Sequence, residues 1–576
     1  MKKIISLTLV LLMLFGTMAT LSSCASKDDG AHIEIYLGDM VYDFDPSEYY
    51  VNSNQEQFMS LLYDPLFYIN EKGKLKKSAA KDYEIDKDNR TITIELRESY
   101  WSDNKRVCAA DYVYAWRRIL DANTANPAAT LFYDIENAVA VKTGVGGYSV
   151  YDLGISAPKT YTIEIKYVEN ADVDRLLRNL SSVCAAPLRQ DVVTQAPAYW
   201  SKMVNMMVFN GPFAITGFDL ETGEISLERN LGYHQGLDEK NYTDEVRPGS
   251  LTARFTLYGE NVSVSYADIE NKVRFFMGDA SLADRKNHQK EATVLDDTST
   301  YTYVFNTNKP LFDHPDVRKA LSLAIDREKI INALTYGKAA DGFIPDAFGG
   351  SDLELISSKA NIAAANELLA GVTFTPSMKK TFTLTVENTE RARTIAEIVK
   401  ECWESLDAGF TVNIEYVGVV ENNANGAIIN DAEMQVLVKE AVHGMRDFDC
   451  IGFDWQFYSD DAAFTGLASL TSSLGGYGVD YSTGKDRYNV SGWNDTYYNH
   501  LVNMAYNANT EEERVEALEE AEKFLIASMP IVPLVFNQTV TFTSSKLKKV
   551  EFTYFGNPVL TNAKLKNYED YLPKED

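Results

Sequence analysis

Hydrophobic and polar positions alternate along several short segments of the chain, and at others they recur at helical spacing. Thr91–Leu96 (TITIEL) alternates in the way that a half-buried strand does, and Glu224–Arg229 (EISLER) has the same character. A turn at Ser102–Lys105 leads to a helix expected from about Ala109 to Leu120, with its apolar residues on one face. The pattern predicts a strand, a turn and a helix whose aromatic side chains face a core.

Later segments show the same mixture of helices and strands. Amphipathic helices are expected over Asp316–Ala333, Arg391–Leu406 and Thr510–Ile526, the last with a capping box of Thr510 and Glu513. The strands Phe410–Tyr416 and Ile531–Phe536 follow the second and third of these helices. These patterns predict a mixed fold of the α/β or α+β class.

The amino-terminal segment predicts export and attachment to a membrane. Lys2 and Lys3 precede the apolar run Ile4–Phe15, which is shorter than the ~20 residues needed to span a bilayer and has the form of a secretory signal. Leu21–Cys24 (LSSC) resembles the lipobox of bacterial lipoproteins. That resemblance implies that residues 1–23 are removed, that Cys24 carries a lipid, and that residues 24–30 form a tether.

Composition limits the possible partners and the number of domains. A chain of 576 residues with 45% hydrophobic residues exceeds what one core usually serves, so two or more domains are expected. The formal charge of −28 excludes nucleic acid as the expected partner, because a polyanion requires basic surfaces. The cysteines other than Cys24 are widely spaced, which favours four separate thiols, although two disulfides remain an alternative in an exported protein.

Motifs that carry catalysis or bind a cofactor are missing from the sequence. There is no G-x-S-x-G, no H-E-x-x-H and no G-x-x-x-x-G-K-[ST], and the six histidines are scattered without ligand spacing. We therefore expect no catalytic residues, no metal and no cofactor. The sequence favours a binding protein over an enzyme, and an exported lipoprotein hydrolase is the alternative from another class.

Several segments, in order along the chain, resemble one family. Tyr100–Leu120 (YWSDNKRVCAADYVYAWRRIL) is similar to the family signature W-S-D-G-x-P-V-T-A-x-D-F-V-Y-A-W-x-R. Leu61–Phe67 (LLYDPLF), Val304–Glu328, Phe448–Trp455 (FDCIGFDW) and Met529–Phe536 (MPIVPLVF) continue the series. The family is the extracytoplasmic solute-binding proteins of peptide-type ABC transporters, the oligopeptide- and dipeptide-binding group known as bacterial solute-binding family 5.

The resemblance implies a bilobal, periplasmic-binding-protein-like fold of type II, in the three-domain peptide-binding variety, with a hinge between the lobes. Its implied domains are, in residue numbers, domain I at 31–70, 181–298 and 531–576, domain II at 71–180, and domain III at 299–530.

The resemblance also implies a ligand site around Asp454–Phe464 (DWQFYSDDAAF), where the family often reads G-W-x-x-D-Y-x-D-P. One residue is missing between Trp455 and Tyr458, so Phe457 falls nearest the Asp that pairs with a peptide amine in oligopeptide binders. Asp454 stands where the family has Gly. The candidate ligand-binding residues are Asp454, Trp455, Phe457, Tyr458 and Asp460 here, and by family position Tyr50, Asn52 and Asn537.

The implied function is capture of a solute outside the cytoplasm. The chain is expected to be a monomeric, lipid-anchored receptor on the extracytoplasmic face of the membrane that binds oligopeptides, closes its lobes and presents the cargo to a permease and its ATPase. The same fold with an oligosaccharide or another small solute as cargo is the alternative. The altered segment at Asp454–Phe464 keeps that alternative open.

Overall fold

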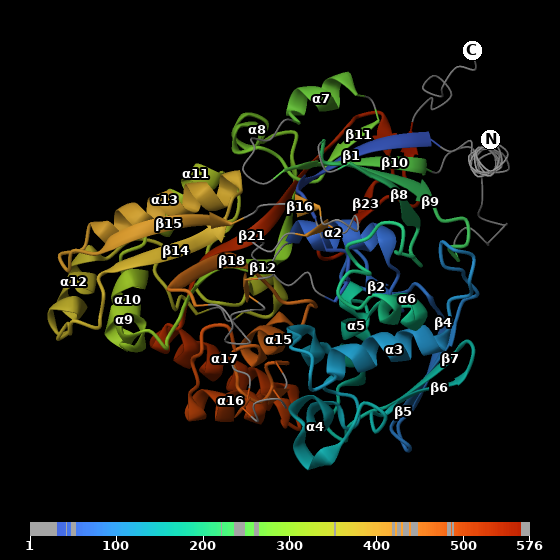
Figure 1. The fold of residues 1–576 in the computed structure, drawn as a ribbon, viewed down its shortest axis with the longest axis horizontal. Helices are drawn as coiled ribbons and strands as arrows, with labels where there is room; N and C mark the ends of the chain where they lie inside the picture. Colours follow the sequence, from blue (N-terminus) through green and yellow to red (C-terminus); the bar gives the residue numbers. More distant parts are fainter. Residues whose placement is uncertain are drawn as a thin grey trace, which may run out of the picture.

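The computed structural model contains an 11-stranded sheet that runs through the whole molecule, and two long strands form its centre (Figure 1). These are β12 (Thr293–Phe305) and β21 (Ile531–Thr543), which pair antiparallel. The structure describes residues 31–41, 43–47, 53–219, 222–234, 248–257, 264–272, 274–350, 353–417, 421–422, 428–429, 437–438, 447–477, 479–480, 485–486 and 489–565.

One half of the sheet lies beyond β21 and belongs to what we call the first lobe. Its strands, in spatial order from β21, are β11 (Phe275–Met277), β1 (Ala31–Asp39), β10 (Pro248–Thr256), β9 (Glu224–Arg229) and β8 (Phe213–Asp219). Helix α2 (Ser53–Leu62) packs on β1 and β8, and α7 (Tyr266–Asn271) and α8 (Leu282–Asn287) lie beside β11 (Figure 1).

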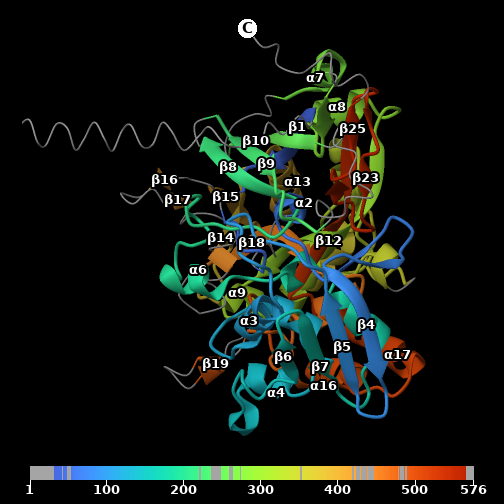
Figure 2. The same cartoon turned by 90° about the vertical axis from the view of Figure 1, so that its right-hand side faces the viewer.

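A smaller antiparallel sheet completes the first lobe, and Figure 2 shows it below the large sheet. Its strands, in order, are β4 (Ala80–Asp86), β5 (Thr91–Leu96), β7 (Thr162–Lys166) and β6 (Ile155–Lys159). The helices around it are α3 (Ala109–Leu120), η1 (Pro127–Phe132), α4 (Ala138–Thr143), η2 (Val145–Gly147), α5 (Val173–Asn179), η3 (Val183–Ala185) and α6 (Gln190–Gln195).

The other half of the large sheet forms the second lobe. Its strands beyond β12 are β18 (Cys450–Gln456), β14 (Thr381–Glu387) and β15 (Thr411–Val417), and β13 (Lys338–Ala339) pairs with β21. Its helices are α9 (Pro310–Asp313), α10 (Pro315–Leu323), α11 (Arg327–Leu334), η4 (Asp346–Phe348), α12 (Ile362–Ala370), α13 (Glu390–Glu404), α15 (Ala462–Ala468), α16 (Thr496–Tyr506) and α17 (Glu511–Ser528).

The described residues also form five two-stranded sheets. They are β2 (Phe67–Ile69) with β3 (Leu75–Lys77), β16 (Glu421–Asn422) with β17 (Ile428–Ile429), β19 (Val479–Asp480) with β20 (Lys485–Asp486), β22 (Leu547–Lys548) with β25 (Lys564–Leu565), and β23 (Glu551–Phe552) with β24 (Pro558–Val559). No helix in the described part of the chain is both long enough and apolar enough to cross a membrane.

The strand–turn–helix unit predicted from the sequence is confirmed, with β5 and α3 at the expected residues. Trp116 is fully buried and its indole N–H donates to the carbonyl of Ala185 at 2.9 Å. Cys108 takes the N-cap position, and Asp111 accepts from the Cys108 backbone N–H at 2.9 Å. The unit is therefore a structural part of the first lobe's core.

The helix predicted over 316–333 is wrong as a single element, because the structure has two helices, α10 and α11, with a break between them. Asp326 lies in the break and caps α11, where its carboxylate accepts from the backbone N–H of Lys329 at 2.9 Å. The fully buried Arg327 donates to the carbonyl of Pro533 in β21 at 2.9 Å. A cap and a buried cation that binds the sheet outweigh the continuous apolar periodicity.

Candidate ligand-binding site between the lobes

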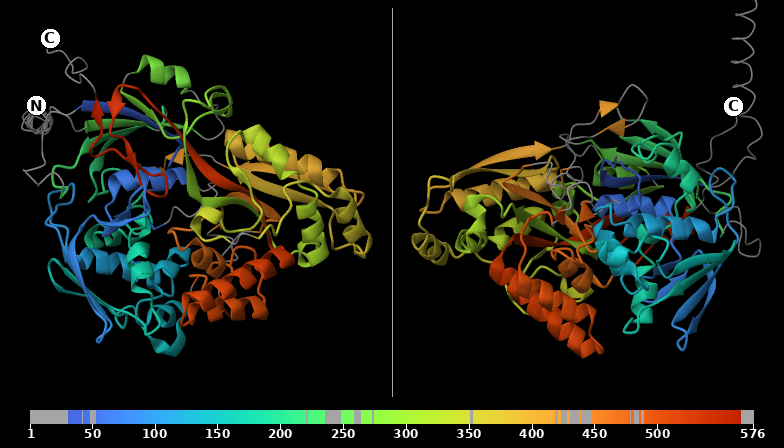
Figure 3. Two further views of the ribbon diagram at one scale, coloured as in Figure 1. Left: turned by 180° about the vertical axis from the view of Figure 1, so that it is seen from behind. Right: turned by 60° about the horizontal axis from the view of Figure 1, so that its bottom comes forward.

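A β-bulge in the central strand pair builds the candidate site. The register of β12 with β21 shifts between Asp296 and Thr300, so three residues of β12 lie opposite the single residue Asn537 of β21. Bulges locally re-aim side chains and occur often next to functional sites. The paired strands that carry this bulge run from one lobe to the other (Figure 3).

A chain of short hydrogen bonds links the bulge to β18. The side-chain N–H group of Asn537 donates to the Ser299 hydroxyl and to the Asp454 carboxylate, both at 2.7 Å. The Ser299 hydroxyl donates to Asp297 at 2.7 Å. Asp454 and Asn537, two of the residues that the sequence proposed for the site, are thus brought together although 83 positions separate them.

Arg391 completes this arrangement, and the sequence analysis did not select it. It lies in the first turn of α13 and donates to both carboxylate oxygens of Asp454, at 2.8 and 3.1 Å, and to Asn537 at 2.6 Å. Burial disfavours the charged guanidinium and by itself lowers the pKa of Arg391, but the neighbouring Asp454 carboxylate raises that pKa above its ordinary value. No spacing in the sequence distinguishes Arg391 from other arginines on amphipathic helices.

A polar cavity of about 80 Å³ opens at this point between the lobes, and we call it the interlobe cavity. The first lobe contributes Asp39 at the end of β1 and Gln57 of α2. The second lobe contributes Arg391 and Asp454, and Asn537 comes from the hinge strand β21. Since both lobes line it, lobe movement changes its shape.

Two carboxyl groups of the cavity titrate far above their ordinary range. Burial, reinforced by the neighbouring Asp279, raises the pKa of Asp39 to about 7. Burial also raises the pKa of Asp297 to about 6, against the opposing hydrogen bond from Ser299. The raised pKa values indicate that nearby positive groups compensate the negative charge of Asp39 and Asp297 only poorly.

Two buried glutamine side chains, Gln456 and Gln57, have unused hydrogen-bonding capacity. Gln456 is only 2% exposed, and among the described residues neither its oxygen nor its nitrogen has a hydrogen-bond partner. Strand alternation puts its side chain on the same face of β18 as Asp454. The side-chain oxygen of Gln57, which lines the cavity, also has no partner among those residues. Such groups are costly unless a ligand or water satisfies them.

The aromatic candidates of β18 and the turn after it lie in a packed core. Trp455 stacks on Phe453 and meets Phe343 edge to face, with ring centroids 5.4 Å apart in both pairs. Phe457 has no exposed surface and also contacts Phe343, at 5.3 Å. Tyr458 is buried with a φ of 63°, a left-handed conformation that forms the tight turn after β18. Of the three, none is among the residues that line the interlobe cavity.

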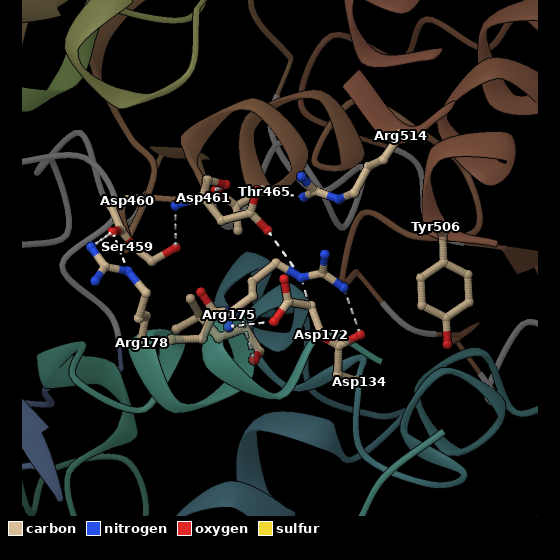
Figure 4. Close-up of polar contacts among 12 residues, drawn as sticks. Asp134, Asp172, Arg175, Arg178, Ser459, Asp460, Asp461, Thr465, Tyr506 and Arg514 are labelled. Atoms are coloured by element: carbon tan, nitrogen blue, oxygen red, sulfur yellow. Dashed lines mark hydrogen bonds and ion pairs between the residues drawn. The ribbon is translucent and has the colours of Figure 1, made fainter. Parts of the chain in front are cut away.

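Asp460 lies elsewhere, in a group of ion pairs between α5 of the first lobe and the start of α15 in the second, which we call the arginine–aspartate cluster (Figure 4). Arg178 donates through its Nε to Asp460 at 2.7 Å. Arg175 binds Asp134 with both ends of its guanidinium group, at 2.9 and 3.1 Å, and lies 3.8 Å from Asp461. A cavity of about 300 Å³ adjoins the cluster.

Three predicted residues lie outside the described part of the chain. These are Cys24, Tyr50 and Asn52. The four remaining cysteines are free thiols in the structure, and burial raises the pKa of Cys108, Cys402 and Cys450 above the ordinary value.

Comparison with solved structures shows the same fold in peptide-binding proteins. Haemophilus influenzae OppA in complex with the peptide RPPGFSPFR has a TM-score of 0.75 at 22% identity, over 93% of this chain and 99% of that one. The murein tripeptide binding protein MppA of Escherichia coli gives 0.74 at 22% identity, covering 93% and 98%. The unliganded open form of MppA gives 0.55 over 93% and 97%.

Two lobes joined by the long strands β12 and β21, with a polar cavity between them, are the architecture of a solute-binding protein. The chain belongs to the bacterial extracellular solute-binding proteins, family 5, whose profile for the middle part matches residues 74–465. The dipeptide-binding protein DppE of Bacillus subtilis is 24% identical over 487 residues, 82% of this chain and 80% of DppE. The family consists of binding proteins rather than enzymes.

Proposed function

We propose that this protein is the lipid-anchored receptor of an ABC importer, which captures oligopeptides between its lobes and delivers them to the permease and its ATPase. The observation that supports peptide cargo is the unused hydrogen-bonding capacity of two buried amide groups. Gln57 lines the interlobe cavity, and Gln456, which is not among its lining residues, lies on the face of β18 that carries Asp454. Two relatives from Bacillus subtilis support the same cargo class: DppE is a dipeptide-binding protein and OppA is an oligopeptide-binding protein.

A peptide backbone offers the groups that these side chains lack. Each peptide unit carries one N–H donor and one carbonyl acceptor. The amide of Gln456 has one acceptor and one donor group, so it can bind one peptide unit on both sides. Because such bonds do not involve ligand side chains, they hold peptides of varied sequence.

The residues proposed for binding remain those expected from the family pattern, now with different roles. Asp454 and Asn537 line the interlobe cavity and contact the ligand directly. Trp455, Phe457 and Tyr458 support β18 from the core behind it, and Asp460 stabilises the closed lobes. Tyr50 and Asn52 stay proposed ligand-binding residues by their family position alone.

The proposed place of action is the outer face of the cell membrane. A lipid on Cys24 anchors the chain, and residues 24–30 act as the tether. We also propose the division into domain I (31–70, 181–298 and 531–576), domain II (71–180) and domain III (299–530). The long central strands β12 and β21 are consistent with the hinge that this division requires.

Native mass spectrometry of the soluble form that starts at Ala25, purified from cells grown in rich broth, tests this function. We expect a bound mass that fragments as peptide and that is reduced in Gln456→Leu, which keeps the apolar bulk but removes the amide. Gln190→Leu on the exposed start of α6 is the matched control. Hexose-spaced masses would instead assign an oligosaccharide as the cargo.

A further inference from the structure

Carboxylates outnumber cationic groups in the interlobe cavity. Six carboxylates line it, against two guanidinium groups. The six are Asp39, Asp279, Asp297, Glu387, Glu390 and Asp454. They come from both lobes and the hinge, so the excess of negative charge is a property of the closed arrangement.

Both guanidinium groups are already engaged by carboxylates. Arg285 pairs with Asp279 and also donates to the carbonyl of Ala280 at 2.9 Å. Arg391 binds Asp454 through two hydrogen bonds. Among the described residues, neither arginine forms an ion pair with Asp39 or Asp297.

Asp39 and Asp297 both line this cavity, and neither has an ion pair among the described residues. Asp297 accepts hydrogen bonds from the hydroxyls of Ser299 at 2.7 Å and Thr539 at 3.3 Å, and Asp454 and Arg391 face it. Asp39 is faced by Asp279, Glu390, Arg391 and Arg393. The raised pKa values of both groups agree with this lack of compensation.

An independent observation also points to a hydrogen-bond donor in the cavity. Gln57 is 4% exposed and lines the cavity from α2. Its side-chain oxygen is buried and has no partner among the described residues. A carbonyl-type acceptor beside carboxylates suits a group that carries several N–H donors and positive charge.

We propose that the interlobe cavity is a subsite for a cationic nitrogen group of the ligand, an ammonium or a guanidinium, held by Asp39, Asp297 and Gln57. This inference rests on the proposed function and specifies its cargo as peptides with a lysine or arginine side chain. The cavity of about 80 Å³ is large enough for a terminal side-chain group.

Calorimetric titration of the soluble protein with matched pentapeptides tests the subsite. Each series is a pentaalanine scaffold in which one position at a time is Lys, Ala or Glu. We expect one position at which Lys binds at least tenfold more tightly than Ala, and Glu more weakly than both. Asp39→Asn and Asp297→Asn should each lower the ratio of the Lys-peptide affinity to the Ala-peptide affinity at least tenfold, whatever their effect on the all-alanine peptide itself. Glu84→Gln, on the exposed face of β4, is the charge-matched control.

The outcomes separate this inference from the proposed function. If all three peptides bind equally, or if both Asn variants keep the wild-type preference for Lys, the cation subsite is wrong and peptide capture stands. If no peptide binds but the polyamine spermidine does, and Asp297→Asn abolishes that binding, the subsite stands and peptide capture is wrong. If neither peptides nor spermidine bind, both are wrong.

Discussion

Removing the ion pair between Arg178 and Asp460 tests whether charges that face each other across the lobes hold the closed arrangement (Figure 4). Arg178 lies on α5 of the first lobe, where it also donates to the carbonyl of Gly73 at 3.1 Å. Asp460 precedes α15 of the second lobe, and 282 positions separate the two residues. Their contact therefore exists only while the lobes are together.

The size of the effect follows from geometry and burial. At a separation of about 3 Å and an effective dielectric constant of about 20, the attraction is about 5 kcal/mol before the cost of desolvation. The side chains of Arg178 and Asp460 keep 22% and 16% of their exposure, and burial raises the pKa of Asp460, which shows that desolvation opposes the pair. After these costs and solvent screening, a net coupling of about 1–3 kcal/mol is expected.

A double-mutant cycle measures this coupling. Arg178→Ala, Asp460→Ala and the double variant are titrated with a bound peptide, because the apparent affinity includes the free energy of closure. A coupling of about 2 kcal/mol corresponds to about a 30-fold change in dissociation constant. X-ray scattering without ligand should show a larger radius of gyration for the single variants. The same cycle on the exposed pair Lys77 and Asp82, both within the first lobe, is the control.

A coupling below about 0.5 kcal/mol, with unchanged scattering, would refute the reasoning. It would mean that this ion pair does not hold the lobes together and that other contacts between them do. One such contact is the hydrogen bond of 2.8 Å from Asn126 N–H to the carbonyl of Gly476, which also joins the two lobes.

Three further predictions concern burial and charge. Burial raises the pKa of Glu56 to about 8, so the folded state is stable with Glu56 neutral at low pH and loses stability as the pH rises from about 4.5 through 8. The variant Glu56→Gln should therefore raise the free energy of unfolding by on the order of 2–4 kcal/mol at pH 8.5 and change it little at pH 4.5. Equal gains at the two pH values would contradict this prediction. Gly466→Ala should lower the unfolding free energy by about 1–3 kcal/mol, because the new Cβ would lie 2.5 Å from the Phe457 ring; an unchanged melting temperature would show that the core relaxes freely. Affinity for a lysine peptide should fall at least tenfold between pH 8 and pH 5, since carboxyls with pKa values of about 6 and 7 must lose their protons to bind a cation, whereas affinity for the alanine peptide should not.

The sequence determined the elements whose signal is local. The strand at Thr91–Leu96 and the helix at Ala109–Leu120 have the predicted bounds, because side-chain periodicity within one element reflects the face it buries. The N-cap of α17 was also readable, because Thr510 accepts from the backbone N–H of Glu513 at 3.2 Å. The predicted capping box is only half formed, since the Glu513 carboxylate accepts from the N–H of Asn509 at 3.1 Å. The family could be recognised because its segments recur in order along the chain.

Only the tertiary structure shows which residues form the site. Asp39, Asp297, Arg391, Asp454 and Asn537 come from separate segments, and no spacing in the sequence shows that they meet. The bulge that aims Asp297 and Asn537 depends on how β12 and β21 pair, which is a long-range register. The charge excess of the cavity likewise depends on which carboxylates already have a partner. Periodicity records what each element buries against its neighbours, whereas a binding site is made of side chains that the fold brings together from distant elements, so its chemistry appears only when the lobes meet.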